Sequence, residues 1–393
     1  MKILTTNSAG NDRFGGIHTR KQEQIKYSPQ HIFHIIELNK EKKYVSQGNF
    51  NIHKISTLDR TNGKTIFEIL NESKNYLEFN QFFEKLVNDY QNVIRDINPD
   101  VVLIPGTSLT SYFLFKACRR EGILNKAIQE YAGVLEKEIG NYTGDTRFIL
   151  GQMGKEFVSD IALDNVTYMF PSQICKKAVE EVHKITINNG HIVWNGVSEE
   201  FVERGFNRQP PNELSLGYVG RVHHVKNLPF FLSLNENMKQ TAKLKIITDI
   251  STAAKKPTGR SLLEKMSEGG VFYYAPRSKK ELKKFYETQL SVAVVPSFFE
   301  TYCNGAIESL VCGTPTLLSD RAGASEVYEK YGLSNLVFSI ENMSSFETAL
   351  MNVKEMNFII DKNLAKEIYE DLKWEKAIVK YNDVIEEVIL KFK

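Results

Sequence analysis

The 393-residue sequence is poor in several residues and patterns that define protein classes. It has four cysteines, Cys118, Cys175, Cys303 and Cys312, which lie far apart and form no Cys-x-x-Cys pair. We therefore expect reduced thiols and no disulfide framework. No apolar run approaches the ~20 residues that span a bilayer. The apolar stretch at the start of the sequence is too short and too polar for a signal peptide. We expect a cytoplasmic protein.

The sequence also lacks an excess of charge of either sign. Lys and Arg number 50 against 48 for Asp and Glu, a formal net charge of +2, and neither half is strongly basic. This balance argues against nucleic acid as a partner. Hydrophobic residues make up 42% and charged residues 25%, as in soluble globular proteins. The length suggests two domains.

Short β-type runs alternate with helical stretches along the chain, which predicts an α/β fold with parallel sheets covered on both faces. The expected strands are residues 1–5, 32–38, 101–105, 165–171, 214–220, 244–248, 271–275 and 291–296. The clearest helical segments are residues 67–97, 279–288 and 304–312.

A polar stretch at residues 203–214 contains Gly205, Pro210 and Pro211 and marks the best domain boundary. We therefore predict two Rossmann-like domains, 1–205 and 206–373, facing each other across a deep cleft. Open α/β sheets bind ligands beyond the carboxyl ends of their strands, so functional residues are expected just after each strand.

Two cations follow the expected strand at 214–220. Arg221 and Lys226 lie in the loop and the early helix after Gly220. Arg binds phosphate through paired hydrogen bonds and Lys as a mobile point charge, so the pair suits a diphosphate. The alternative is two solvated surface cations.

Two carboxylates flank a turn after the expected strand at 291–296. Glu300 lies in the loop, a helix begins near Asn304, and Glu308 lies at the margin of the helix face that enters the core. The helix N-terminus offers free N–H groups to a phosphate, and ionised Glu accepts hydrogen bonds from sugar hydroxyls. Alternatively, Glu300 caps the helix and Glu308 is solvated.

Two further loops are rich in small residues. Residues 313–326 would allow a ligand close approach to the backbone. Gly15-Gly16 precedes an expected helix near the N-terminus, which by itself is a weak phosphate-loop signal. No G-x-G-x-x-G follows the first strand, which argues against a nicotinamide dehydrogenase.

Order and spacing together resemble one family, the group 1 retaining glycosyltransferases, which have the GT-B fold. Glu300 and Glu308 reproduce the E-x7-E spacing of that family. The segments that match in the family's order are Gly15-Gly16, Pro171-Ser172, Trp194-Asn195-Gly196-Val197, Gly220-Arg221 with Lys226, Pro296-Ser297 with Glu300 and Glu308, Cys312-Gly313-Thr314-Pro315, and Trp374. The resemblance covers nearly the whole chain and is strongest after residue 165.

The resemblance implies roles for these residues. Arg221 and Lys226 would hold the diphosphate and stabilise it as it leaves, and Glu300 would contact the transferred sugar. Glu308 would bind the ribose hydroxyls. A C-terminal helix, residues 374–393, would cross back to the first domain. The other donor-binding positions implied are Gly15, Gly16, Arg277 beside the base, Tyr302, Cys303 and Asn304.

The resemblance further implies a hexosyltransferase that retains anomeric configuration by front-face transfer. A nucleotide sugar, UDP-sugar first, would be the co-substrate, with no other cofactor. The chain has no Asp-x-Asp, which fits a metal-independent enzyme. The expected acceptor is a glycan, a lipid-linked glycan or a protein.

The chain departs from the family's pattern at several positions. Cys303 and Asn227 stand where the family favours glycine, and Ala322-Gly323-Ala324 replaces a glycine pair. Where many members carry an acceptor-side histidine, this chain has Glu130 or Tyr131.

Other interpretations stay open. The chain would alternatively be a catalytically silent GT-B subunit that binds a glycan or a partner transferase, or a nucleotide-sugar epimerase. Residues 111–126 combine aromatic and basic side chains. They would either contact an anionic membrane peripherally, at its inner face, or pack against the sheet.

Overall fold

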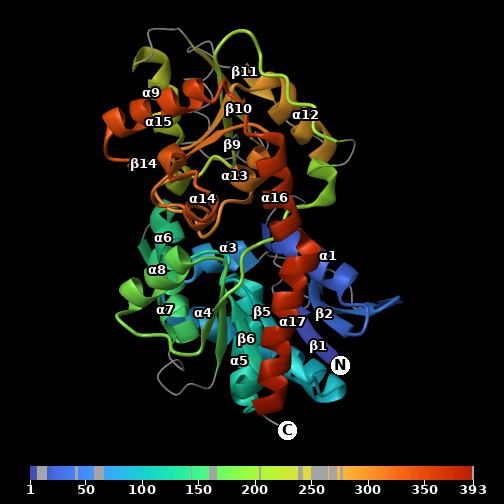
Figure 1. Cartoon of the computed structure of the whole chain (residues 1–393). Helices are drawn as coiled ribbons and strands as arrows, with labels where there is room; N and C mark the ends of the chain where they lie inside the picture. Colours follow the sequence, from blue (N-terminus) through green and yellow to red (C-terminus); the bar gives the residue numbers. More distant parts are fainter. Residues whose placement is uncertain are drawn as a thin grey trace. The chain divides into compact units, whose positions relative to one another are not determined.

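The structure is a computed structural model that describes residues 1–6, 16–39, 43–56, 66–142, 144–158, 166–202, 205–237, 242–248, 264, 272–274 and 278–391. Contacts divide the chain into two compact units. Unit 1 comprises Met1–Trp194 and Trp374–Lys393, and unit 2 comprises Asn195–Lys373. Figure 1 shows the elements of both units, coloured along the sequence.

Unit 1 alternates strands and helices. Its strands are β1 (Lys2–Thr6), β2 (Ile32–Asn39), β3 (Lys43–Gln47), β4 (Phe50–Ser56), β5 (Val101–Pro105), β6 (Ala127–Glu130), β7 (Thr167–Phe170) and β8 (Gly190–Ile192). Its α-helices are α1 (Gly16–Tyr27), α3 (Ile66–Glu72), α4 (Tyr76–Ile97), α5 (Leu109–Arg120), α6 (Leu135–Glu138), α7 (Gly144–Val158), α8 (Gln173–His183) and α17 (Trp374–Lys391).

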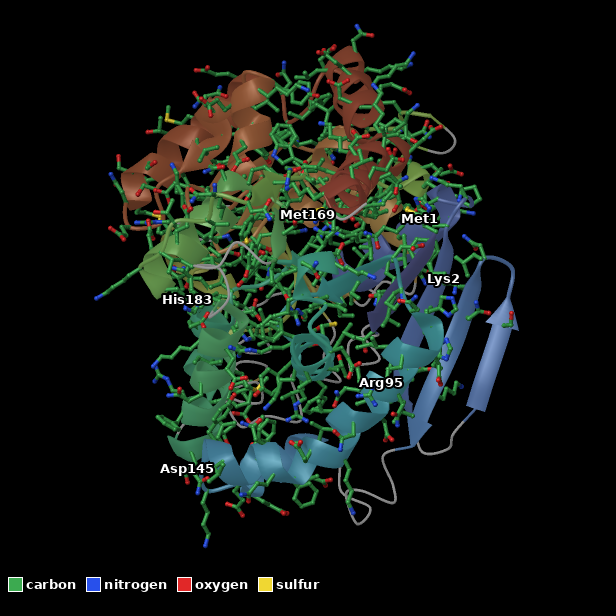
Figure 2. The ribbon with its side chains drawn as sticks, turned by 90° about the horizontal axis from the view of Figure 1, so that it is seen from below. Met1, Lys2, Arg95, Asp145, Met169 and His183 are labelled. Carbon is green, nitrogen blue, oxygen red and sulfur yellow. The ribbon has the colours of Figure 1, made fainter. Side chains whose placement is uncertain are left out.

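The strands of unit 1 form one sheet, in the order β3-β4-β2-β1-β5-β6-β7-β8 among the described residues. Every neighbouring pair is parallel except β3 and β4, which are antiparallel and are drawn in blue at the outer edge of the sheet in Figure 2. The strand order reverses at β1, which lies between β2 and β5. Such a reversal opens a crevice at the carboxyl ends of the strands.

The last helix, α17, completes the core of unit 1 although it is far from the sheet in sequence (Figure 1). Its apolar face packs on side chains from β1, β2, β5, β6 and β7. Two contacts tie it to α1 and the residue that follows α1: Arg20 lies over the Tyr381 ring at 5.2 Å, and the Ser28 hydroxyl is 3.1 Å from Asn382 Oδ1. The α17 residues buried in this core are Trp374, Ala377, Ile378, Tyr381, Val384, Ile385 and Val388.

Unit 2 is built on the same plan. Its strands are β9 (Ser215–Val219), β10 (Lys243–Ile247), β11 (Phe272–Tyr274), β12 (Val292–Val295), β13 (Thr316–Ser319) and β14 (Val337–Phe338). Its α-helices among the described residues are α9 (Leu228–Asn237), α12 (Lys279–Gln289), α13 (Asn304–Val311), α14 (Ser325–Lys330), α15 (Met343–Glu355) and α16 (Lys362–Leu372).

The sheet of unit 2 is parallel throughout its described strands, in the order β11-β10-β9-β12-β13-β14. The order reverses between β9 and β12, so the loops that follow these two strands leave the same edge side by side. Close packing beneath them requires Gly217 in β9, since a Cβ there would lie 2.3 Å from Leu290 Cδ1. The fold therefore places the two predicted motifs next to each other.

The predicted α/β class with two Rossmann-like sheets is confirmed. The expected helix over 67–97 is in fact two helices, α3 and α4, because Asn75 caps α4 by accepting a hydrogen bond from the Glu78 N–H. The antiparallel pair β3 and β4 was not predicted.

The contact-based boundary differs from the predicted one at residues 195–205, which belong to unit 2. Phe201 is buried, with its ring centroid 6.4 Å from that of Tyr286. Cys312 Sγ lies 3.7 Å from the Phe201 carbonyl oxygen, and Lys279 Nζ donates to Ser198 Oγ at 2.7 Å. This segment therefore contributes to the core of unit 2 before the polar stretch begins.

The aromatic segment proposed as a membrane contact packs inside unit 1. It lies largely in α5, where Tyr112, Phe113, Leu114 and Phe115 are all buried. These four side chains therefore pack inside the unit, as in the alternative that the segment packs against the sheet. Among the described residues, no helix combines the length and the apolar character needed to cross a membrane.

Candidate functional site

The loop after β9 carries the two predicted cations. The Tyr218 hydroxyl donates to the Arg221 carbonyl at 2.8 Å, and the Gly220 N–H donates to the Ile247 carbonyl at 3.0 Å, so the start of the loop is fixed. A 3-10 turn, His224–Lys226, follows. Arg221 is exposed, whereas the Lys226 side chain is 19% exposed.

Three hydrogen bonds fix Glu300 in the loop after β12. Its N–H donates to the Arg321 carbonyl at 3.1 Å, and its carbonyl accepts from the Gly323 N–H at 3.0 Å. Its Oε1 accepts from Ser297 Oγ at 2.9 Å. The Glu300 side chain is 11% exposed, so backbone and carboxylate are both oriented before any ligand arrives.

The two loops meet through an ion pair between Lys226 Nζ and Glu300 Oε1. The Phe298 N–H also donates to the Val225 carbonyl at 2.8 Å. Because both charged side chains are mostly buried, their attraction is screened less than that of a surface pair. The structure thus brings together a cation and a carboxylate that lie 74 residues apart in sequence.

The N-terminus of α13 opens beside this pair. Cys303 precedes the helix and makes no side-chain capping hydrogen bond, and the Tyr302 carbonyl accepts from the Ala324 N–H at 2.7 Å. The first N–H groups of a helix have no partner within it. Together with the helix dipole they favour an anion at this position.

Cys303 adopts a backbone conformation that side chains rarely take, with φ +91° and ψ +74°. Asn227 is also left-handed, with φ +49°. The sequence departs from the family's glycine at these two positions. Asn tolerates a left-handed conformation, whereas a residue such as Cys costs roughly 1–2 kcal/mol there. The loop between Glu300 and α13 is therefore strained at Cys303.

We expect Cys303→Gly to be more stable than Cys303→Ala by about 1 kcal/mol, because only glycine is free of the left-handed penalty. Chemical denaturation of the two variants measures the difference. Cys312 in the same unit, with φ −80°, is the matched control. At position 312 we expect the Ala variant to be more stable than the Gly variant. If the Ala variant were also the more stable at position 303, Cys303 would not be strained.

Glu308 lies on α13, and burial raises the pKa of its carboxyl to about 7. The positive charge of Lys279 acts against this rise, and the negative charge of Glu200 adds to it. The side chain is partly exposed. A carboxylate that has lost part of its hydration is ready to accept hydrogen bonds from ligand hydroxyls.

The predicted acceptor-side residues are both buried in unit 1. Tyr131 is 2% exposed and its ring stacks on Phe170 at 5.1 Å. Glu130, 3% exposed, accepts a hydrogen bond from Gln24 at 3.0 Å. Burial lowers the pKa of the nearby Lys21 ammonium to about 8, with Glu130 acting against this. In this structure neither predicted residue offers its side chain to solvent.

Three predicted donor-binding positions give little or no geometry. Gly15 and Arg277 lie outside the described residues, and Gly16 is described only as the first residue of α1. The four cysteines are free, and Cys118, Cys175 and Cys312 are buried as expected.

Sequence reasoning assigned no role to two residues that hold the site. Ser297 orients the Glu300 carboxylate, and Asn195 donates to the Asn304 side chain at 2.8 Å. Both belong to motifs that carry the family resemblance, Pro296-Ser297 and Trp194-Asn195-Gly196-Val197. Their partners are distant in sequence or set by the loop, so the motifs alone did not reveal what they bind.

Comparisons with known proteins bear on the family and the fold. Residues 200–371 match the family described as Glycosyl transferases group 1. The fold is similar to that of sucrose-phosphate synthase from Thermosynechococcus elongatus, with a TM-score of 0.72, 12% identity and 100% of each chain covered. HepE from Anabaena, solved in complex with UDP and glucose, gives a TM-score of 0.67 at 11% identity, covering 98% of this chain and 100% of that chain. A glycosyltransferase from Rickettsia africae gives a TM-score of 0.65 at 17% identity, covering 100% of this chain and 99% of that chain. A search of curated protein sequences gave no match.

The structural likeness defines the class: the fold is that of the GT-B transferases, in which two Rossmann-like domains are joined in one chain. Residues 200–371, which lie within unit 2, match the group 1 glycosyltransferase family that the spaced motifs predicted. This match and the fold together support a glycosyltransferase.

Proposed function

We propose that the chain transfers a sugar from a nucleotide sugar, UDP-sugar first, to a glycan, a lipid-linked glycan or a protein, with retention of anomeric configuration. The observation that carries the donor assignment is the Lys226–Glu300 pair at the strand-order reversal of unit 2, beside the N-terminus of α13. Two of the structures with this fold were solved with such ligands: HepE with UDP and glucose, and an Escherichia coli trehalose-6-phosphate protein with UDP-2-fluoro glucose.

In this proposal Arg221 and Lys226 bind the diphosphate, together with the backbone N–H groups that begin α13. Glu300 accepts hydrogen bonds from the sugar hydroxyls, and Glu308 accepts them from the ribose. Lys226 would then exchange part of its contact with Glu300 for the phosphate. The two cations supply the charge that the diphosphate needs, so the proposal requires no metal ion.

The reaction breaks the bond between the anomeric carbon and the diphosphate oxygen. The acceptor oxygen forms its new bond to the same face of the sugar, and its proton passes to the leaving phosphate oxygen. Negative charge grows on the diphosphate as the bond breaks. Fixed cations and N–H groups aimed at that charge lower the barrier because they need no reorganisation during the step.

The test is a thermal-unfolding panel with UDP, GDP, ADP, dTDP and CMP, followed by sugar nucleotides of the base that binds. A ligand at 100 times its Kd stabilises the fold by about 2.7 kcal/mol. We expect UDP to give the largest shift, followed by slow release of sugar from a UDP-sugar. Absence of a shift from every nucleotide would contradict the donor site, and binding without sugar release would favour the silent-subunit alternative.

The pKa of Glu308 makes ribose binding depend on pH. Below pH 7 its carboxyl is increasingly protonated, and it then accepts hydrogen bonds poorly from the ribose. We expect nucleoside affinity to fall about tenfold from pH 8 to pH 6, since the ionised fraction falls by that factor for a pKa near 7. Titration calorimetry with uridine, which carries no titrating phosphate, measures this. In Glu308→Gln the uridine affinity should be low and should not change between pH 8 and pH 6. If that variant kept the pH dependence of the wild type, Glu308 would not be the titrating group.

A further inference from the structure

The motif Trp194-Asn195-Gly196-Val197 has no role in the proposed mechanism, yet it reaches the donor site through Asn195. Asn195 is 7% exposed, and its Nδ2 donates to Asn304 Oδ1 at 2.8 Å across 109 residues of sequence. The backbone around it is held within unit 2. The Val197 N–H donates to the Leu372 carbonyl at 2.7 Å, and Val197 pairs with Lys373 as a parallel bridge.

This hydrogen bond decides which way the Asn304 amide faces. An amide side chain has one accepting end and one donating end. Because Asn195 occupies Oδ1, the Nδ2 of Asn304 is turned away from Asn195. In the part of the chain that the structure describes, the bond from Asn195 is the only side-chain hydrogen bond of Asn304, which is partly exposed.

The Nδ2 group belongs to the first residue of α13. The amide is therefore carried at the N-terminus of that helix, directly after Cys303 in the loop from Glu300. A donor at this position adds to a set that already favours negative charge. An oxygen of the diphosphate is the matching acceptor in the proposed function, since it carries charge and has no proton to donate.

We propose that Asn195 is a positioning residue that fixes the Asn304 amide with Nδ2 toward the donor diphosphate. This role rests on the proposed function. Without Asn195 the amide is free to turn, and it can then present Oδ1 to the phosphate, which repels it. With Asp at position 195 the partner can only accept, so Asn304 must give it Nδ2 and turn Oδ1 toward the phosphate.

The experiment is titration calorimetry of Asn195→Ala, Asn195→Asp and Asn304→Ala. The ligands are the nucleoside diphosphate that binds the wild type best in the panel and the corresponding nucleoside. Loss of one neutral hydrogen bond weakens binding about 2–13-fold, so we expect that range for the two Ala variants with the diphosphate. Asn195→Asp should lose more than either. Nucleoside affinity should stay within about twofold for all three variants, since its hydrogen bonds do not involve Asn304.

The double variant Asn195→Ala/Asn304→Ala completes the test. If Asn195 acts only through Asn304, the double variant binds the diphosphate as weakly as Asn304→Ala alone. Equal losses for diphosphate and nucleoside would show a merely structural role and overturn the proposal, as would wild-type diphosphate affinity in Asn195→Asp. Asn304→Ala leaves Asn195 in place and decides the matter if Asn195→Asp does not fold. A wild type that binds no nucleoside diphosphate would overturn the proposed function itself.

Discussion

In the proposed function, Lys226→Ala will lower the rate of sugar transfer by about 10²–10³-fold, because it removes a fixed cation from the charge that develops on the leaving diphosphate. Arg221→Ala should have an effect of the same order. The measurement is release of nucleoside diphosphate at saturating donor. The fold should remain, since Glu300 keeps its hydrogen bond from Ser297 and its two backbone bonds to the loop after β13.

Lys280 is the matched control, an exposed lysine on α12 in the same unit. Lys280→Ala should leave both the rate and the melting temperature near those of the wild type. Near-normal rates in both Lys226→Ala and Arg221→Ala would remove the diphosphate assignment. A collapse of the melting temperature in Lys226→Ala would instead show that its pair with Glu300 is mainly structural.

Deleting residues 374–393 will prevent unit 1 from folding. The deletion removes the whole of α17 from the core of the sheet, including Trp374, Ile378 and Tyr381. Burying one large apolar side chain contributes about 1.5–3 kcal/mol, so the six that α17 buries contribute about 9–18 kcal/mol. This loss is as large as the roughly 5–15 kcal/mol by which a native protein is stable. Circular dichroism and urea unfolding of the truncated chain measure it.

Substitutions at two neighbouring residues of α17 test whether its packing in the core stabilises unit 1. Ile378 is 1% exposed and Val379 is 57% exposed on the same helix. Ile378→Asp buries an unpaired charge and should destabilise unit 1 by several kcal/mol, whereas Val379→Asp should stay within about 0.5 kcal/mol of the wild type. Similar behaviour of the two variants would show that α17 is not part of the core.

The sequence was sufficient to predict the strands that face helices on both sides. β5 coincides with the expected residues 101–105, and β9, β10 and β12 lie within a residue or two of the expected runs. β5 and β12 are buried along their whole length, so their hydrophobic runs are continuous and end at loops. Because ligand-binding loops follow the carboxyl ends of such strands, Arg221, Lys226 and Glu300 could be selected in advance as candidate site residues.

The remaining features depend on the fold. The pair β3 and β4 lies at the sheet edge, where composition constrains a strand weakly. The hydrogen bond from Asn195 to Asn304 joins distant segments, and no local pattern encodes it. The sequence shows that Cys303 stands where the family favours glycine. Only its backbone φ angle shows that this residue is conformationally strained.

Unit 1 is discontinuous in the chain, whereas unit 2 is one uninterrupted stretch. Domains generally fold in the order in which the ribosome delivers them, and this chain cannot follow that order. Residues 1–194 emerge first but stay without the helix that covers one face of their sheet until residues 374–393 leave the exit tunnel. Unit 2, delivered later, has all its residues sooner. A nascent chain therefore carries an unfinished apolar surface through most of its synthesis, and a premature stop within the final helix should harm the beginning of the protein more than its middle.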